Sequence, residues 1–146
     1  MKLDLGCGAN KKEGCVGIDN ATESMTGKQF APDMIADLNL GIPVPPNSCE
    51  YIYSSHALEH FKNPHFIMDE IHRVCADNAT VEIVVPLYCD WLADHLTMFY
   101  PDWFERNLDI LKYHIIYKNI AYKKFTTPLA GRHGFVELHI ILKVKK

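Results

Sequence analysis

The feature that most constrains the fold is a series of short apolar runs, each ending at a glycine, an aspartate, a serine or a proline. Amphipathic stretches separate several of these runs, and this alternation is typical of a parallel sheet with crossover helices. α/β folds place their binding loops at the carboxyl ends of such strands, so a site is expected where the runs end. The predicted strands cover residues 2–5, 15–18, 34–36, 50–54 and 80–85.

Length and composition indicate a single domain spanning residues 1–146. A chain of 146 residues that is 48% hydrophobic can fill one core, but it is too short for two well-filled domains. The net charge of -3 gives no basic field, so no nucleic-acid partner is expected. The apolar runs are far too short to span a membrane and no signal peptide is visible, so we predict a cytoplasmic protein with no membrane partner.

The most regular amphipathic stretch predicts a helix over residues 64–76. Asn63 is a preferred residue type at an N-cap, and Pro64 suits the first turn. The apolar residues that share one helical face are Ile67, Ile71, Val74 and Cys75. This face should lie on the sheet.

A second helix is predicted to begin near Asp102. Asp102 and Glu105 have the spacing of a capping box, in which each side chain bonds to the backbone of the other residue. The apolar stripe that follows consists of Phe104, Leu108 and Leu111.

Two strands are predicted after this helix, at about residues 113–121 and 135–145. In the second, apolar and polar residues alternate, which is typical of an antiparallel strand with one solvated face. An exposed apolar strand of this kind often pairs with a copy of itself, so a homodimer is one expected state.

The first predicted strand runs directly into a tight glycine turn, Gly6-Cys7-Gly8. Glycine is needed where backbone turns sharply or approaches a ligand closely. Asp19 ends the next strand, and a carboxylate beside such a turn can accept both hydroxyls of an adenosine ribose. A second acidic strand end follows at Asp37. The dinucleotide motif G-x-G-x-x-G is incomplete because its last position is Lys11, so pyrophosphate binding is disfavoured.

The order of these residues, followed by Ser54-Ser55-His56-Ala57-Leu58-Glu59-His60-Phe61 after the fourth strand, resembles class I S-adenosylmethionine-dependent methyltransferases. Within them the chain is most similar to the small type 11 group, from residue 3 to about residue 86 and more loosely beyond. The resemblance implies an α/β fold with a Rossmann-like, mostly parallel sheet, crossover helices and a C-terminal antiparallel strand. Only residues 9–15 separate the glycine turn from the second strand, so the first crossover helix is expected to be abbreviated or absent.

Eight residues match cofactor-binding positions of that family. The resemblance implies that S-adenosylmethionine is bound by Asp4, Gly6, Gly8, Asp19, Asp37, Leu38, Ser55 and His56. The first three would border the methionine end of the cofactor, and Asp19 would bind the ribose. Asp37 would meet the adenine, and His56 would lie below the sulfonium.

A competing motif is H-x-x-E-H of zinc peptidases, which His56, Glu59 and His60 also form. In that motif two histidines bind zinc and the glutamate activates water, and Glu70 is the nearby carboxylate that could complete the site. However, peptidases with this motif are much larger, multi-domain chains. In this sequence the segment follows a strand that ends in two serines, which resembles methyltransferases. The five cysteines are an odd number without a C-x-x-C pair, which indicates neither a disulfide framework nor a zinc knuckle. We therefore predict no bound metal.

Methyl transfer is an in-line displacement in which the thioether leaves without a proton, so the enzyme mainly aligns the acceptor and excludes water. A hydroxyl or ammonium acceptor also needs a base. The candidate bases are His56, His60, Asp90 and His95. Of these, His56 and Asp90 are the predicted catalytic residues.

The leading functional prediction is S-adenosylmethionine-dependent methyl transfer to a small-molecule acceptor, such as a sugar or another metabolite. Methyl transfer is what the resemblance implies, and a small acceptor is expected because the sequence contains no large substrate-binding insertion. The alternative is a catalytically inactive S-adenosylmethionine-binding module that acts in a complex, and the short chain with its missing crossover helix is compatible with it. Zinc hydrolysis ranks third.

Overall fold

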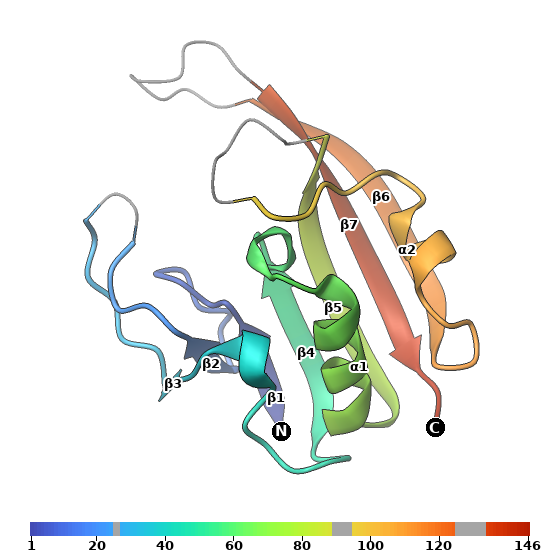
Figure 1. Ribbon diagram of the computed structural model, residues 1–146, viewed down its shortest axis with the longest axis horizontal. Helices are drawn as coiled ribbons and strands as arrows, with labels where there is room; N and C mark the ends of the chain where they lie inside the picture. Colours follow the sequence, from blue (N-terminus) through green and yellow to red (C-terminus); the bar gives the residue numbers. More distant parts are fainter. Residues whose placement is uncertain (25–26, 89–94, 125–133) are drawn as a thin grey trace.

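Figure 1 shows the computed structural model, which describes residues 1–24, 27–88, 95–124 and 134–146. Within these residues the chain forms one seven-stranded sheet in the order β3-β2-β1-β4-β5-β7-β6. The strands are β1 (Lys2–Leu5), β2 (Val16–Asp19), β3 (Met34–Ile35), β4 (Cys49–Ser55), β5 (Cys75–Leu87), β6 (Tyr113–Lys124) and β7 (Gly134–Val144). The strands β1 to β5 pair in parallel, whereas β7 is antiparallel to both β5 and β6. The predicted mostly parallel sheet with a C-terminal antiparallel strand is confirmed.

The strand β7 lies between β5 and β6, so the order of strands differs from the order in the chain at this edge of the sheet. Along β7 the side chains of Leu138, Ile140 and Leu142 are fully buried, whereas Glu137 and His139 on the other face are only half-buried. This is the predicted alternation, because successive side chains of a strand point to opposite faces.

Helix α1 (Pro64–Val74) covers β4 and β5 in Figure 1. The side chain of Asn63 accepts hydrogen bonds from the backbone N–H groups of His65 and Phe66 at 3.1 and 3.2 Å, which satisfies two donors of the first turn. The helix ends two residues earlier than predicted, because Cys75 takes an extended backbone and begins β5. The buried side chains of this helix are Pro64, Ile67, Met68, Ile71 and Val74.

Helix α2 (Trp103–Asn107) follows Asp102, as predicted, but it has only five residues. The predicted capping box is wrong, since Asp102 makes no side-chain cap and instead accepts a hydrogen bond from Nε of Arg106 at 2.5 Å. The predicted stripe ends early, because the helix stops at Asn107 and Leu111 is 77% exposed. Neither this helix nor any other helix of the described residues is long and apolar enough to cross a membrane.

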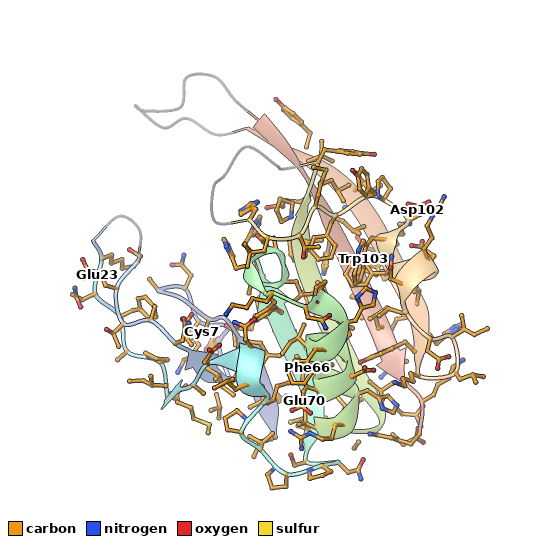
Figure 2. All side chains as sticks on the ribbon, viewed as in Figure 1. Cys7, Glu23, Phe66, Glu70, Asp102 and Trp103 are labelled. Atoms are coloured by element: carbon orange, nitrogen blue, oxygen red, sulfur yellow. The ribbon has the colours of Figure 1, made fainter. Side chains whose placement is uncertain are left out.

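The helices lie on one face of the sheet. The ring of Trp103 in α2, which is labelled in Figure 2, lies 5.4 Å from the ring of His65 in α1. No helix occurs between β1 and β2, where every residue is described, so the predicted loss of the first crossover helix is confirmed. Within the described residues the connections before α1 contain only two short 3-10 helices, η1 (Leu38–Leu40) and η2 (Leu58–His60).

The opposite face of the sheet carries a polar and aromatic network. Glu82 accepts a hydrogen bond from the hydroxyl of Tyr51, lies 3.1 Å from Nε2 of His139 and 3.7 Å from Nζ of Lys12. The ammonium group of Lys12 also lies 4.3 Å from the centre of the Tyr53 ring. These side chains are half-buried, because in the described residues no helix covers them.

The four described cysteines are Cys7, Cys15, Cys49 and Cys75, and each is buried and free of a disulfide. Burial raises the pKa of Cys7 to about 11 and that of Cys75 to about 12. Both thiols are therefore protonated at neutral pH and behave as small apolar side chains.

Candidate functional site

The glycine turn after β1 is fixed by its contacts with two neighbouring strands. The backbone N–H of Gly6 donates to the carbonyl oxygen of Ile18 in β2 at 2.8 Å. Gly6 has φ +68°, and a Cβ placed on it would lie 2.4 Å from Cβ of Ala57, which follows β4. A side chain at this position would therefore collide with Ala57, so glycine is required by packing as well as by backbone conformation.

Asp19, at the end of β2, connects the glycine turn with the loop that follows β2. Its Oδ2 accepts a hydrogen bond from the backbone N–H of Gly8 at 2.9 Å, and its Oδ1 accepts one from Ala21 at 2.9 Å. Each carboxylate oxygen has a second lone-pair direction, so Asp19 can accept further hydrogen bonds from a ligand.

Asp37 caps the 3-10 helix η1. Its Oδ1 accepts hydrogen bonds from the backbone N–H of Asn39 at 2.9 Å and from the side-chain amide of Asn39 at 3.0 Å. These bonds lower the pKa of Asp37, so the carboxyl is ionised at neutral pH. The neighbouring Leu38 is 4% exposed and anchors the turn in the core.

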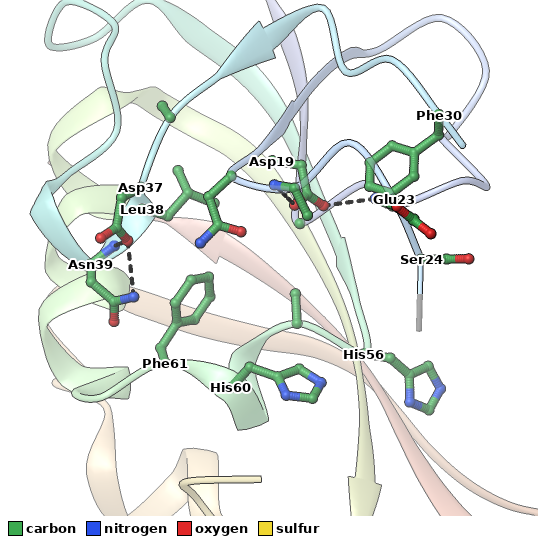
Figure 3. Close-up of a pocket in the computed structure, with 16 residues that line it drawn as sticks. Asp19, Glu23, Ser24, Phe30, Asp37, Leu38, Asn39, His56, His60 and Phe61 are labelled. Carbon is green, nitrogen blue, oxygen red and sulfur yellow. Dashed lines mark hydrogen bonds between the residues drawn. The ribbon is translucent and has the colours of Figure 1, made fainter. Parts of the chain in front are cut away.

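A pocket of about 360 Å³ opens at the carboxyl ends of β1, β2, β3 and β4. It is shown in Figure 3. Six of the eight predicted cofactor-binding residues line it: Gly6, Gly8, Asp19, Asp37, Leu38 and His56. The chain segments that carry these residues are as much as 50 residues apart in the sequence, and the parallel strands bring them to one edge, as expected for an α/β sheet.

Ten further residues line the pocket without having been predicted as cofactor-binding. They are Asn20, Ala21, Glu23, Ser24, Phe30, Ala36, Asn39, Ala57, His60 and Phe61. Several of them come from the long connection between β2 and β3, which has neither a helical nor a strand periodicity in the sequence. The segment that follows β4 was recognised, but the sequence motif alone did not distinguish the residues that face the pocket.

His56 stands directly after β4 with φ +53°, a left-handed conformation that is uncommon for a residue with a side chain. Its backbone N–H donates to the carbonyl of Val84 at 2.9 Å, which holds this conformation. Its Nε2 lies 2.8 Å from Oε1 of Glu137 and its Nδ1 lies 3.5 Å from Oε1 of Glu59. Burial alone lowers the pKa of His56, but the two nearby carboxylates outweigh this effect and raise the pKa above its ordinary value.

Two predicted cofactor-binding residues do not line the pocket. Asp4 is only 2% exposed and its Oδ2 accepts a hydrogen bond from the backbone N–H of Lys12 at 2.7 Å. Burial raises the pKa of Asp4, and the hydrogen bond from Lys12 acts in the opposite direction. Asp4 thus holds the loop after the glycine turn. Ser55 is the last residue of β4 and is not among the lining residues.

A protein-family model described as a methyltransferase domain matches residues 3–117. The chain belongs to this family of methyltransferase domains. The predicted resemblance to class I S-adenosylmethionine-dependent methyltransferases is thereby confirmed.

Several solved structures share the fold of this chain. A Bacillus halodurans protein named as a methyltransferase is 12% identical, with a TM-score of 0.73, and the match covers 99% of this chain and 92% of that one. A chain in the complex between the Haloferax volcanii activator Trm112 and a methyltransferase is 14% identical, with a TM-score of 0.74 and coverage of 99% and 82%. A Methanosarcina mazei protein described as S-adenosylmethionine-dependent is 12% identical, with a TM-score of 0.63 and coverage of 99% and 92%. A search of curated proteins finds no significant match.

The cofactor prediction for this methyltransferase, S-adenosylmethionine, agrees with the family and with the shape of the pocket. A Cβ placed on Gly8 would meet no atom within 4 Å, so the turn leaves open space beside the backbone where a ligand can approach. Asp19 offers carboxylate oxygens for ribose hydroxyls, and Asp37 with Leu38 offers a polar and an apolar group for adenine. The residues present therefore fit this cofactor.

The other predicted residues of the methyltransferase do not form a peptidase site. Glu70 accepts hydrogen bonds from Nε of Arg73 at 2.7 Å and from the backbone N–H of Ile42 at 2.9 Å, so these groups already occupy the carboxylate that the zinc-peptidase alternative would need as a ligand. His56 precedes η2 with a left-handed backbone, so the two motif histidines do not share one regular α-helical turn. The predicted catalytic residue Asp90 lies outside the described residues.

Proposed function

We propose that this protein transfers the methyl group of S-adenosylmethionine to a small-molecule acceptor. The observation that carries the proposal is one pocket in which the glycine turn, Asp19, Asp37 and His56 meet at the carboxyl edge of a parallel sheet. Each of these groups complements a different part of the cofactor, which is what a pocket with a few convergent polar groups provides.

The cofactor supplies an electrophilic methyl carbon whose leaving group needs no proton. The task of the protein is therefore to orient the acceptor along the carbon–sulfur axis and to exclude water. We assign Asp19 to the ribose hydroxyls and Asp37 to the adenine amino group, because both are acceptors that face the pocket.

His56 is the residue that we assign to proton removal from the acceptor. It lines the pocket, and its imidazole lies between the carboxylates of Glu59 and Glu137, which stabilise the protonated form. A base is needed only for a hydroxyl or ammonium acceptor. Asp90 remains a second candidate for this role.

Calorimetric titration with S-adenosylmethionine and with its demethylated product tests the cofactor site. We expect micromolar binding of both, and a loss of about tenfold or more in Asp19→Asn, because hydrogen bonds to a charged group contribute about 1.5–3 kcal/mol. The matched control is Asp69→Asn, since Asp69 is an exposed carboxylate on α1 that is paired with Lys112. No binding of either ligand to the folded wild-type protein would exclude the proposal.

A second candidate function is a cofactor-binding subunit that acts only with a partner protein. The helix-free face of the sheet favours it, because half-buried side chains such as Tyr51 and Tyr53 remain accessible there. One of the similar structures is itself a complex with a methyltransferase activator. Methylation of any small acceptor by the purified chain alone would reject this second candidate, whereas cofactor binding without turnover would favour it.

A further inference from the structure

The side-chain carboxylate of Glu59 is buried and has no hydrogen bond to any residue that the structure describes. The residue is 1% exposed, and neither of its side-chain oxygens has a hydrogen-bond partner within the described residues. The nearest basic groups are Nδ1 of His56 at 3.5 Å, at the outer limit of a hydrogen bond, and Nε2 of His60 at 4.0 Å. An ionised carboxylate in such a place is costly unless a cation is close to it.

Two imidazoles complete a set of three donors with this carboxylate. The candidate ligand atoms of Glu59, His60 and His95 all lie within 4.8 Å of one another. The rings of His60 and His95 meet edge to face, with their centres 4.9 Å apart. The carbonyl oxygen of Glu59 accepts hydrogen bonds from the backbone N–H groups of Leu96 at 2.7 Å and Thr97 at 3.1 Å, which hold His95 next to Glu59.

We propose that Glu59, His60 and His95 bind a divalent transition-metal ion, of which Zn²⁺ suits the donors best. Two imidazoles and one carboxylate are a typical ligand set for such ions, and three protein ligands leave a coordination position open. Ligand atoms around a tetrahedral zinc ion stand about 3.4 Å apart, so the three side chains need only small rotations to close on an ion. The negative charge of Glu59 is neutralised by the same ion.

The proposed metal site adjoins the cofactor pocket. His60 lines the pocket together with His56, and Figure 3 shows their rings next to each other along one side of it. The next step rests on the proposed function. A metal ion held by these three residues would bind a hydroxyl of the acceptor at its open coordination position, and would thereby lower the pKa of that hydroxyl. His56 would accept the hydroxyl proton, and the new bond between the acceptor oxygen and the methyl carbon would replace the carbon–sulfur bond, whose electron pair would remain on sulfur. The substrate class is therefore an alcohol or a phenol.

The metal site is tested by titrating chelator-treated protein with ZnCl₂ in a calorimeter, without cofactor. We expect one equivalent to bind to the wild-type protein and binding to weaken at least tenfold in Glu59→Gln and in His95→Ala. The matched control is His114→Ala, which removes an exposed histidine on β6 and should bind like the wild type. Cobalt(II) absorption provides a second measurement, because its visible bands require coordination by the protein.

Equal zinc affinity in the wild type and in Glu59→Gln, or no binding above that of a surface histidine, would overturn the metal site. In that case Glu59 serves as a counter-ion of His56. Cofactor titration of the same samples separates the two proposals. Zinc binding without cofactor binding contradicts the proposed function, whereas cofactor binding without zinc binding contradicts the metal site alone.

Discussion

Gly6 and Gly8 both have a left-handed backbone, but different surroundings require it. Gly6 is packed against Ala57, whereas Gly8 faces open space in the pocket. Gly6 is therefore needed for packing of the turn, whereas Gly8 leaves room for a ligand. Substituting each of them by alanine separates the two contributions.

We expect Gly6→Ala to lower the free energy of unfolding by about 3 kcal/mol, because a collision in the core adds to left-handed strain. Gly8→Ala should cost about 1 kcal/mol, since only the strain remains. The same Gly8→Ala protein should lose affinity for S-adenosylmethionine, because its methyl group enters the pocket. Urea denaturation and calorimetry measure the two effects, and equal stabilities of the two variants would contradict this account.

The roles of single aspartates show where sequence reasoning succeeds. Asp19 and Asp37 were predicted as pocket residues because each ends a strand, and both line the pocket. Asp4 lies within β1 and points instead to the backbone of Lys12. The sequence motif predicts where a residue lies along its strand. It does not predict which way the side chain points when a neighbouring loop offers a hydrogen-bond donor, as the backbone N–H of Lys12 does for Asp4.

At the scale of elements, α1 is connected to the loop before β4 by an ion pair. Glu70 and Arg73 are bonded to each other, and Arg73 also donates to the carbonyls of Ile42 at 2.8 Å and Val44 at 3.1 Å. Glu70 in turn accepts from the backbone of Ile42. The pair therefore holds the chain between η1 and β4 against the helix.

Because of this ion pair, the free energy of unfolding is expected to depend on pH in the acid range. Bonding with Arg73 lowers the pKa of Glu70 below its unfolded value of 4.5, so the folded state binds fewer protons than the unfolded state. Its stabilisation is complete above 4.5 and is lost as the pH falls through the lower folded value. We expect Glu70→Gln to be less stable at pH 7 by about 1 kcal/mol, and the difference from wild type to vanish in acid.

Urea midpoints of both proteins, measured from neutral pH down to about pH 3.5, check this prediction. Glu50→Gln is the control, because Glu50 is exposed at the start of β4. A wild-type minus variant difference that stays constant with pH would show that the Glu70 charge makes no contribution.

The elements differ in how well the sequence predicts them. β1 and the start of α1 follow from apolar periodicity and capping, which are local signals. β5 begins at Cys75 rather than at residue 80, because Cys75 already pairs with Cys49 of β4; an irregularity follows, in which Asn78 takes φ +61°, before Thr80 pairs with Tyr51. In α2, Trp103 and Phe104 pack against core residues that are distant in the sequence, so local periodicity does not predict where this helix ends. The pocket residues of the β2–β3 connection were missed because their positions also depend on distant contacts rather than on local periodicity.

For the whole molecule, the sheet order predicts a gradient of local stability. β4 and β5 have a strand on both sides and a helix over one face, whereas β3 and β6 are edges. Backbone amides in the middle of a sheet exchange with solvent only through large openings.

Hydrogen exchange followed by mass spectrometry or NMR measures this gradient. We expect the amides of Ile52, Ile83 and Ile140 to be the slowest, and those of β3 and the outward amides of β6 to exchange at least about tenfold faster. Protection of the β6 edge equal to that of β5 would instead indicate that another chain pairs with it, which is one way in which a homodimer could form.

The position of β7 also has a consequence for biosynthesis. Every lining residue among those that the structure describes precedes residue 62, whereas β7 begins at Gly134. The ribosome therefore delivers these lining residues while one side of β5, from Thr80 to Leu87, still lacks its partner. During that interval the unpaired backbone of the nascent strand can join a strand of another chain. Correct assembly in the cell therefore depends on β7, which contributes none of the described lining residues of the pocket.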